Sequence, residues 1–403
     1  MRGDRILRVG PDAEVEAPEG AEILEADGRT LLPGLTDLHT HLGEDDGLLN
    51  LAGGVTAVRD LGNDIDAVTA LASSWESGRT LGPRVTLAGI IDGPGPYAGP
   101  TKMLVATEDE ARAAIDAYAE RGFVQIKLYS SLDRELVPFM IDYAHSKGLR
   151  VSGHVPAFMT AAEVVRDGYD EIQHANFLVL NFLFDDVQDT RTPARFTAVA
   201  EHGGELDPGA PEVSAFFDLL TAHETVLDPT VGIFEMLLTA RPGVVSPGFA
   251  PVADRLPVLV RRGALGGGLA VPDGQDALYH RSFQTLEDFV YEAWRRGIRI
   301  VAGTDGLAGF MLHRELELYV EAGIPPAEVL ALDTLGAARV LGRESDLGEI
   351  HPGKLADMIL VDGEPDRRIS DVRNVVTVIR GGAVLDVAAM DRALGITPRQ
   401  AVD

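Results

Sequence analysis

The chain of 403 residues contains no cysteine and only two tryptophans. The absence of cysteine excludes disulfide frameworks, thiolate nucleophiles, Cys-ligated zinc and iron–sulfur clusters. Any metal chemistry must therefore use histidine and carboxylate ligands. That restricts the search for a metal site to ten histidines and the acidic residues.

Positive charge is also scarce, because 35 lysines and arginines stand against 63 acidic residues and the net charge is −28. Binding to nucleic acid or to an anionic membrane surface needs clustered basic side chains, so we expect neither partner. A small-molecule substrate is expected instead. A homo-oligomer is left open, since net charge does not determine the assembly.

Long apolar runs are missing too. No stretch of 18 or more apolar residues occurs, and the residues after Met1 form no apolar signal core. As given, the sequence predicts a cytoplasmic protein. A strand-like segment, RILRVG, lies directly at the start, so an upstream strand or a cleaved leader is left open.

Short β-branched runs alternate with helical runs between Leu31 and Gly342, a pattern typical of repeated βα units and a parallel sheet. Eight strands are expected, near residues 35–41, 55–60, 84–91, 124–129, 150–154, 171–174, 225–229 and 299–305. Eight such units predict an α/β fold, a closed (β/α)₈ TIM barrel.

Helices are predicted over residues 108–122 and 134–148, where apolar residues recur at spacings of three and four and a glycine ends each segment. Two connections, 181–211 and 239–284, are rich in Gly, Pro and Asp and exceed ordinary loop length. We expect them either to cover the barrel mouth as lids or to be plain solvated insertions.

The two ends of the chain contain short strands parted by Gly and Asp turns. We therefore predict three parts. Residues 1–33 form the N-terminal part of a small β-sandwich domain, which is incomplete if an upstream strand is missing. Residues 34–342 form the (β/α)₈ barrel, and residues 343–403 form the C-terminal part of the small domain with a tail.

The strongest single motif is PGLTDLHTH, which ends in His39 and His41. Residues two apart in a strand share a face, so both imidazoles are expected to point into the barrel while Leu38 and Thr40 face the helices. Two imidazoles at this spacing can chelate a metal. A bare HxH also occurs by chance, but its predicted place at the carboxyl end of a barrel strand favours a metal site.

Lys127 lies mid-strand between Ile126 and Leu128, so alternation directs its amine into the barrel. Burial depresses a lysine pKa by up to ~3–5 units, which favours a neutral amine unless an acid pairs with it. A neutral amine can capture carbon dioxide as a carbamate, an anionic ligand with two oxygens. The alternative is a structural lysine paired with an acid.

Three further residues end predicted strands: His154, His174 and Asp305. Each histidine taken alone is more often a core residue, yet both fall at the same end of the barrel as the HxH pair. A carboxylate at position 305 could ligate a metal and take a proton from a metal-bound water, so Asp305 is the predicted general base.

As a set, these motifs resemble the amidohydrolase superfamily of the binuclear type. PGLTDLHTH, the strand lysine, GHVP, QHANF and GTDG occur in the order of that family, and DLGEIHPGKLADMILVDG resembles its C-terminal pattern. Within it, residues 303–342 are similar to the imidazolonepropionase-related branch with prolidase-like and Xaa-Arg-type dipeptidases. Imidazolonepropionase itself is mononuclear and lacks the strand lysine, so Lys127 argues against that activity.

The resemblance implies two divalent metal ions, usually zinc, that share a bridging hydroxide. It implies that His39, His41 and Asp305 hold one ion, that His154 and His174 hold the other, and that carboxylated Lys127 bridges them. The implied reaction is hydrolysis of an amide bond in a small molecule, such as a dipeptide or an N-acyl amino acid.

Two other functions stay open. The apolar stretch FLVLNFLF after His174 would line the mouth, which favours a lactone, carbamate or phosphoester substrate at the same centre. A non-catalytic oligomeric scaffold is the third hypothesis, although such relatives usually lose ligands and all six are present here.

Substrate contacts are expected from a small group of polar residues: Tyr129, Asn176, Arg59, His280 and His313. For Tyr129 a packing role is the alternative, and for His313 a role at a helix start. The remaining histidines are expected to be structural or exposed: His145, His202, His223 and His351.

Overall fold

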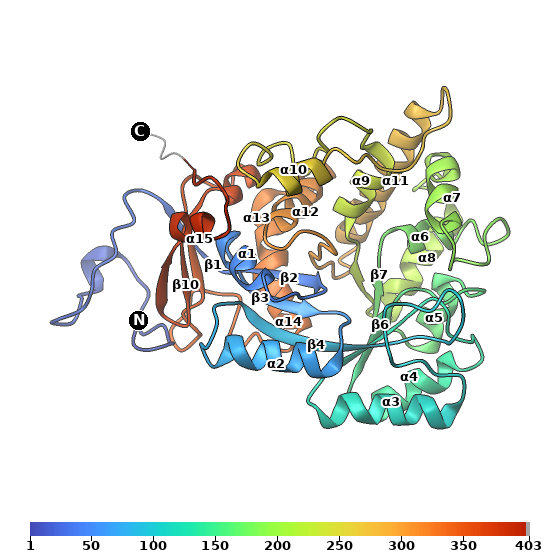
Figure 1. The fold of residues 1–403 in the computed structure, drawn as a ribbon, viewed down its shortest axis with the longest axis horizontal. Helices are drawn as coiled ribbons and strands as arrows, with labels where there is room; N and C mark the ends of the chain where they lie inside the picture. Colours follow the sequence, from blue (N-terminus) through green and yellow to red (C-terminus); the bar gives the residue numbers. More distant parts are fainter. Residues whose placement is uncertain (400–403) are drawn as a thin grey trace.

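The structure is a computed structural model that describes residues 1–399. Its main body is a barrel of parallel strands that pair in chain order. The regular strands are β2 (Leu35–Thr40), β3 (Val55–Asp60), β4 (Arg84–Ile91), β5 (Gln125–Leu128), β6 (Arg150–Gly153), β7 (Glu171–Gln173) and β8 (Val226–Asp228). Figure 1 shows these strands surrounded by helices, which confirms the predicted α/β barrel.

The segment 299–305 closes the barrel between β8 and β2. Ile300 forms a single parallel bridge with Leu227 of β8. On the other side, Leu38 donates its amide N–H to the carbonyl of Ala302 at 2.9 Å, and Asp305 donates to the carbonyl of His39 at 2.8 Å. The eighth expected strand is thus an extended segment and not a regular strand, because its hydrogen bonds to the two neighbours are too scattered to form a continuous ladder.

Helices form the outer layer of the barrel. They are α1 (Asp46–Ala52), α2 (Ile65–Glu76), α3 (Glu108–Glu120), α4 (Val137–Ser146), α5 (Ala161–Asp167), α6 (Asn176–Leu180), α8 (Pro211–Ala222), α9 (Val231–Thr239), α11 (Asp276–Arg295), α12 (Phe310–Glu321), α13 (Pro326–Ala331) and α14 (Ala337–Val340). Both helices predicted in detail are present as α3 and α4. Gly122 and Gly148 follow them with φ of 78° and 75°, a conformation that favours glycine.

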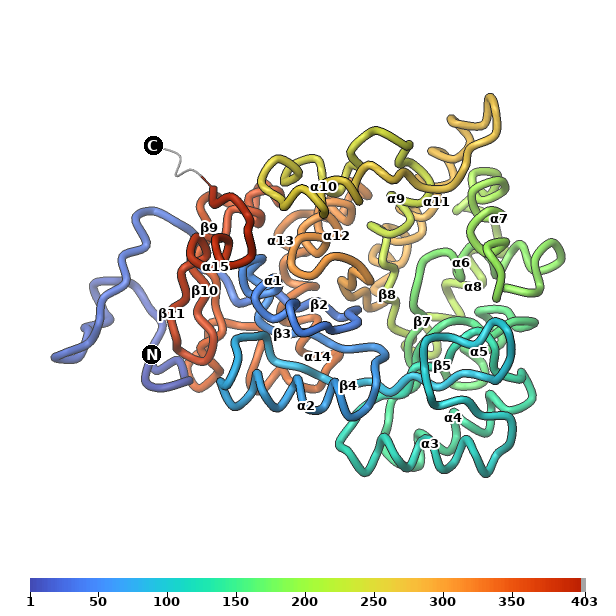
Figure 2. Tube along the Cα trace, in the orientation of Figure 1, coloured from blue at the N-terminus to red at the C-terminus, as the bar shows by residue number. Residues whose placement is uncertain are grey.

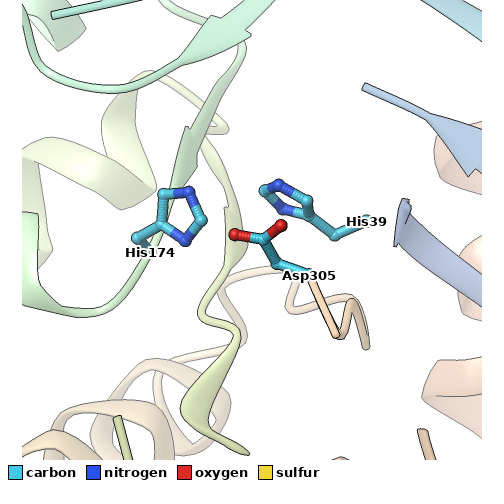
Figure 3. Close-up of side chains that lie close together, drawn as sticks. All are labelled: His39, His174 and Asp305. Carbon is cyan, nitrogen blue, oxygen red and sulfur yellow. The ribbon is translucent and has the colours of Figure 1, made fainter. Parts of the chain in front are cut away.

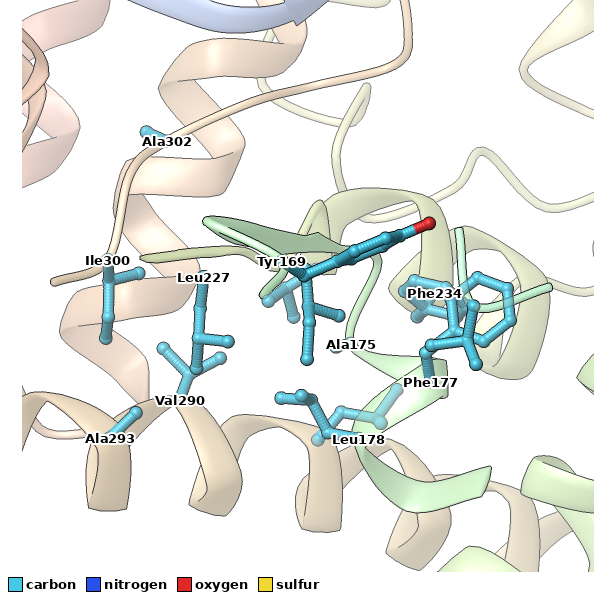
Figure 4. Packing of buried hydrophobic residues seen from close by; sticks show 14 of the residues in the cluster. Tyr169, Ala175, Phe177, Leu178, Leu227, Phe234, Val290, Ala293, Ile300 and Ala302 are labelled. Atoms are coloured by element: carbon cyan, nitrogen blue, oxygen red, sulfur yellow. The ribbon is translucent and has the colours of Figure 1, made fainter. Parts of the chain in front are cut away.

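One large apolar core lies between the strands and these helices. Figure 4 shows part of it, where Leu227 and Ile300 of the barrel wall lie beside Val290 and Ala293 of α11. Leu38 likewise packs outward with the α14 residues Ala337 and Val340, as alternation along β2 predicts. The inward faces of the strands are therefore left to polar side chains.

A second sheet joins the two ends of the chain, as predicted. Its antiparallel order is β1 (Thr30–Pro33), β9 (Met358–Val361), β10 (Val375–Arg380) and β11 (Ala383–Asp386), followed by α15 (Val387–Ala393). Figure 2 shows the blue N-terminal chain and the red C-terminal strands on the same side of the barrel. Within residues 1–399 this part is one four-stranded sheet, so the expected two-sheet sandwich is corrected to a single layer.

The two long connections contain short helices. Residues 181–211 include α7 (Ala194–His202), and 239–284 include α10 (Val258–Gly263) and the start of α11. Among the described residues, no helix is long and apolar enough to cross a membrane.

Candidate metal centre

The predicted ligands meet at the carboxyl ends of the barrel strands. His39 lies in β2 and Lys127 in β5, while His154 and His174 directly follow β6 and β7. Asp305 ends the closing segment. Carboxyl ends of barrel strands share one face of the fold, so residues up to 266 positions apart come together there.

The tightest group consists of His39, His174 and Asp305, each of which offers one ligand atom within 4.8 Å of the others. Figure 3 shows the two imidazoles and the carboxylate pointing toward one another. His41 lies next to them, with its Nε2 3.5 Å from Oδ1 of Asp305. The His154 ring centre is 4.8 Å from that of His174.

Each of the four imidazoles is held through its Nδ1 atom. His39 Nδ1 donates to Oδ2 of Asp228 at 2.8 Å, and His41 Nδ1 donates to the carbonyl of Gly62 at 2.8 Å. These two acceptors leave Nε2 with its lone pair toward the centre. The Nδ1 atoms of the other two contact hydroxyls, at 2.9 Å in the pair Ser130–His154 and 2.8 Å in the pair Thr230–His174.

Two of the ligands have unusual backbone conformations. His174 has φ of 69° and Asp305 has φ of 48°, in the left-handed region that side chains other than Gly, Asn and Asp rarely adopt. The hydrogen bonds of both residues to the barrel wall maintain this geometry: His174 donates to the Asp228 carbonyl at 2.8 Å, and Asp305 donates to that of His39 at 2.8 Å. Strain of this kind concentrates at functional sites.

Lys127 is buried, and its Nζ lies 3.1 Å from Nε2 of His39. Within residues 1–399 no carboxylate lies within 4.0 Å of this amine, so the alternative of an acid-paired lysine does not fit. Burial lowers the pKa of Lys127 to about 8. A minor fraction of the amine is thereby neutral at physiological pH and available to react.

Burial also lowers the pKa of the histidines, with Lys127 as a further cause for each of them. For His39, His154 and His174 the pKa falls well below the usual value. Neutral imidazole is the metal-binding form, since a ligand must present a lone pair. The donor set, four imidazoles with a carboxylate and an amine, therefore fits divalent ions such as zinc.

A cavity of about 250 Å³ opens over the centre. Its polar wall contains five of the six predicted ligands, and its apolar wall contains Phe177, Phe196, Ile233 and Phe234. The expected apolar rim after His174 is thus present in part, through Phe177. Further apolar side chains come from 181–211 and from α9, which sequence periodicity did not single out.

Two of the predicted substrate contacts line this cavity. Tyr129 lies with its ring centre 3.9 Å from that of His154, and Asn176 is buried at the start of α6. The structure thus brings both residues to the centre.

Three other predicted contacts do not reach the cavity. Arg59 is fully buried inside the barrel and pairs with Glu171, because a guanidinium that points inward from β3 meets that carboxylate. His313 lies inside the protein, where its Nε2 contacts the carbonyl of Gly53 at 2.7 Å. His280 is exposed on α11 beside Asp276. These three predictions are corrected.

The four remaining histidines are exposed, as expected: His145, His202, His223 and His351. Sequence reasoning missed Asp228, which orients His39, and Arg195, which lines the cavity from α7. The position of Asp228 at the end of a predicted strand was a usable signal, whereas Arg195 lies in a connection with no periodic pattern.

A second polar layer lies one step deeper in the barrel. Arg59 donates two hydrogen bonds to Glu171, at 2.8 and 2.6 Å, and a third to Gln125 at 3.1 Å. Gln125 and Gln173 both donate to the hydroxyl of Ser152. This network supports the strands that carry the ligands.

A closed parallel barrel with this donor set at the carboxyl ends of its strands defines the class of barrel enzymes that use metal ions. Comparison with known proteins agrees. A model of the Amidohydrolase family matches residues 287–385. The imidazolonepropionase of Solibacter usitatus is 25% identical over 386 residues, which cover 92% of this chain and 85% of that enzyme.

A shorter match, 39% identical over 83 residues, connects the chain with a 5-methylthioadenosine/S-adenosylhomocysteine deaminase of Symbiobacterium thermophilum. It covers 17% of this chain and only 19% of the deaminase. This relative therefore says nothing about the activity of the whole protein.

Solved structures share the complete fold. A Xaa-Pro dipeptidase with methionine bound in its active site superposes with a TM-score of 0.66 at 21% identity, over 96% of this chain and 94% of that one. Bottromycin amidohydrolase superposes with a TM-score of 0.69 at 22% identity, over 91% and 81%. These likenesses show that the chain has the fold of these enzymes, and its residues 287–385 match the Amidohydrolase family.

Proposed function

We propose that this protein hydrolyses an amide (C–N) bond of a small molecule, such as a dipeptide or an N-acyl amino acid, with two divalent ions, in the first place zinc. The observation that carries the proposal is the convergence of His39, His174 and Asp305 within 4.8 Å at the floor of the cavity. The likeness to a dipeptidase and to an amidohydrolase supports an amide as the bond.

The residues that would hold the ions are those of the six-member set: His39, His41, Lys127, His154, His174 and Asp305. When bound, divalent ions would lower the pKa of a water and polarise the scissile carbonyl. The Asp305 carboxylate takes the proton of the attacking water and delivers it to the leaving amine. Tyr129, on the cavity wall, donates a hydrogen bond to the carbonyl oxygen.

Lys127 enters this site as a carbamate. Its neutral amine attacks the carbon of carbon dioxide, an N–C bond forms, one C=O electron pair moves to oxygen, and a proton leaves to solvent. The product is an anion in place of a cation, which suits a position surrounded by imidazoles and lacking any carboxylate within 4.0 Å among the described residues.

Metal analysis combined with Asp305→Asn tests the proposed reaction. Asn tolerates the left-handed backbone at this position, so the substitution changes the chemistry without adding strain. We expect about two equivalents of metal in the wild type and a loss of kcat of about 10³-fold or more in the variant. Absence of divalent metal, or unchanged turnover of amides by the variant, would refute the proposal.

Labelling with ¹³C-bicarbonate tests the carbamate. We expect a carbamate resonance in the wild type that disappears in Lys127→Arg, because arginine stays protonated and cannot react. Lys354→Arg is the matched control, since Lys354 is also buried but pairs with Glu349 at 2.6 Å. A carbamate resonance that persists in Lys127→Arg would show that a residue other than Lys127 carries the carbamate.

A second candidate function keeps the centre and changes the bond to that of a lactone, a carbamate or a phosphoester. The apolar cavity wall around Phe177 and Phe234 favours it. Comparison of kcat/KM for dipeptides and N-acyl amino acids with kcat/KM for aryl esters, lactones and carbamates decides between the two.

A further inference from the structure

Arg195 is an unpaired cation in the wall of the cavity. It lies in the first turn of α7, inside the connection 181–211, and lines the cavity together with Tyr129 and His174. Its guanidinium donates to the carbonyl of Thr190 at 3.1 Å and lies against the ring of Phe196. Within residues 1–399 no carboxylate lies within 4.0 Å of it.

This isolation is unusual for a half-buried arginine. Burial lowers the pKa of Arg195, which means that the folded protein holds the charge at a cost. The nearby Arg191, four residues earlier on the same segment, is paired by contrast, and contacts Asp189 through two nitrogens at 2.8 Å. A guanidinium has five N–H donors, and most of those of Arg195 are left for a ligand.

The charge of the cavity wall points to the sign of that ligand. Arg195 is a cationic side chain of the wall, while the carboxylate among the lining residues, Asp305, belongs to the predicted ligand group. The protein as a whole has a net charge of −28, so a cation without a nearby counter-charge is opposite to the general composition. An anionic group is therefore favoured inside the cavity.

A second unpartnered group lies beside Arg195. Asn176 is 1% exposed and lines the same cavity, and its Oδ1 has no hydrogen-bond partner within the described part of the chain. The amide of Asn176 is oriented because its Nδ2 donates to the backbone carbonyl of Arg195 at 3.5 Å. Oδ1 is thus left as an acceptor, and a buried acceptor without a donor is costly unless a ligand supplies one.

We infer that Arg195 binds a free carboxylate of the substrate while Asn176 accepts an N–H group beside it, so that the substrate class is small amides that carry a carboxylate. Guanidinium and carboxylate form paired hydrogen bonds of high specificity. This inference rests on the proposed function for the bond that is cleaved, but the recognition of the carboxylate is a separate claim. The cavity of about 250 Å³ limits the substrate to a compact molecule.

Matched substrates test the inference. Dipeptides and N-acetyl amino acids are each compared with the C-terminal primary amide of the same compound, which differs only in the carboxylate. We expect the wild type to prefer the acid by about 13- to 160-fold in kcat/KM, since a charged hydrogen-bonded pair contributes about 1.5–3 kcal/mol and a tenfold change corresponds to 1.36 kcal/mol.

Variants of Arg195 test whether this residue causes the preference for the acid over the amide. Arg195→Met keeps the length of the side chain, and we expect the ratio of kcat/KM for the acid to kcat/KM for the amide to fall to about 1–3. Arg195→Lys keeps the charge but not the planar fork, so an intermediate ratio is expected. Arg191→Met is the control, because Arg191 has its own acid partner and does not line the cavity; it should leave the ratio unchanged.

A binding measurement separates this inference from the proposed function. N-acetyl-L-leucine and N-acetyl-L-leucinamide are titrated calorimetrically into the metal-loaded wild type and Arg195→Met. Tighter binding of the acid that disappears in Arg195→Met supports the inference even if no amide is cleaved. Equal binding of acid and amide, or a preference that persists in Arg195→Met, overturns it even if amides are cleaved.

Discussion

Two polar layers inside one barrel differ in how their groups are satisfied. In the deeper layer, Arg59 and Glu171 pair through two hydrogen bonds, and Gln125 completes the network. In the layer at the mouth, nitrogen faces nitrogen: Nζ of Lys127 lies 3.1 Å from Nε2 of His39. The same strands β5 and β7 support both layers.

The difference shows which layer exists for the fold and which for chemistry. Donors in the deeper layer meet acceptors, so it can be buried without a ligand. The mouth gathers imidazole and carboxylate lone pairs around a single amine, that of Lys127, an arrangement that divalent cations would stabilise. Buried polar groups inside this barrel therefore serve two separate purposes, stability in the deeper layer and metal binding at the mouth. Four predictions test that separation.

The largest effect is expected from His174→Asn at the mouth. Asn tolerates the φ of 69° at this position, so the backbone should be retained. We expect kcat/KM to fall about 10³-fold, equivalent to roughly 4 kcal/mol, while the unfolding free energy of the metal-free protein changes by less than about 1 kcal/mol. Denaturant unfolding in chelator and steady-state kinetics measure the two quantities. A metal-free variant as unstable as a core mutant would contradict the separation.

The next largest effect is expected from Glu171→Gln in the deeper layer. The substitution leaves the Arg59 guanidinium buried with a weakened partner, and removing one member of a buried pair costs about 3–5 kcal/mol. Denaturant unfolding of the metal-free protein is the measurement. Glu76→Gln is the control, because the side chain of Glu76 is 64% exposed beside Arg84 and should contribute less than about 1 kcal/mol. Equal losses in both variants would mean that the deeper layer is not structural.

Asp228 connects the two layers, since its Oδ2 accepts from His39 and lies 3.5 Å from Arg59. We expect Asp228→Asn to weaken metal binding about 10- to 100-fold, because a carboxylate behind a ligating imidazole fixes its tautomer and raises its basicity. Competition with a chelating dye measures the affinity. Ser130→Ala, which removes a neutral hydroxyl behind His154, should have a smaller effect. The reverse order of the two variants would show that the charge of Asp228 is not the cause.

The smallest effect concerns a buried acid outside the barrel lumen, Glu287 of α11. Burial raises its pKa from 4.5 to about 7. The charged groups around it, on its own helix and on the helices packed against it, are Glu321, Arg314, Glu235 and Asp288. The folded state therefore holds more protons than the unfolded state between pH 4.5 and about 7, and stability falls as pH rises through this window.

Glu287→Gln removes that penalty. We expect the variant to be more stable than the wild type by about 1–2 kcal/mol at pH 8 and equal to it near pH 4.5. Thermal unfolding at the two pH values checks this. If the difference in stability between variant and wild type is the same at both pH values, packing and not the charge of Glu287 is its cause. The distinction between paired and unpaired polar groups would then hold only for the two layers inside the barrel.

Much of the barrel could be predicted from local patterns. Alternating βα units located seven regular strands, and two-residue periodicity placed His39 and Lys127 on the inward face. The eighth strand could be located but not described correctly, because an extended segment with scattered ladder hydrogen bonds has the same local sequence pattern as a regular strand.

The site was predictable for a different reason. Its ligands follow strands, and the carboxyl ends of barrel strands share one face, so their proximity follows from the topology. Arg59, His280 and His313 failed as substrate contacts because the direction and reach of a side chain depend on its partners in space.

Sequence alone determined the strand order, the inward face of each strand and the chemical types at the carboxyl ends, because these depend on local alternation and on the order of the chain. Tertiary packing alone decided which nitrogen of each imidazole faces the centre. It also decided that, among residues 1–399, Lys127 has no acid partner and Arg195 reaches the cavity without a counter-charge. The reason is physical: pairing and burial depend on distances between residues that are remote along the chain, and no local pattern encodes those distances.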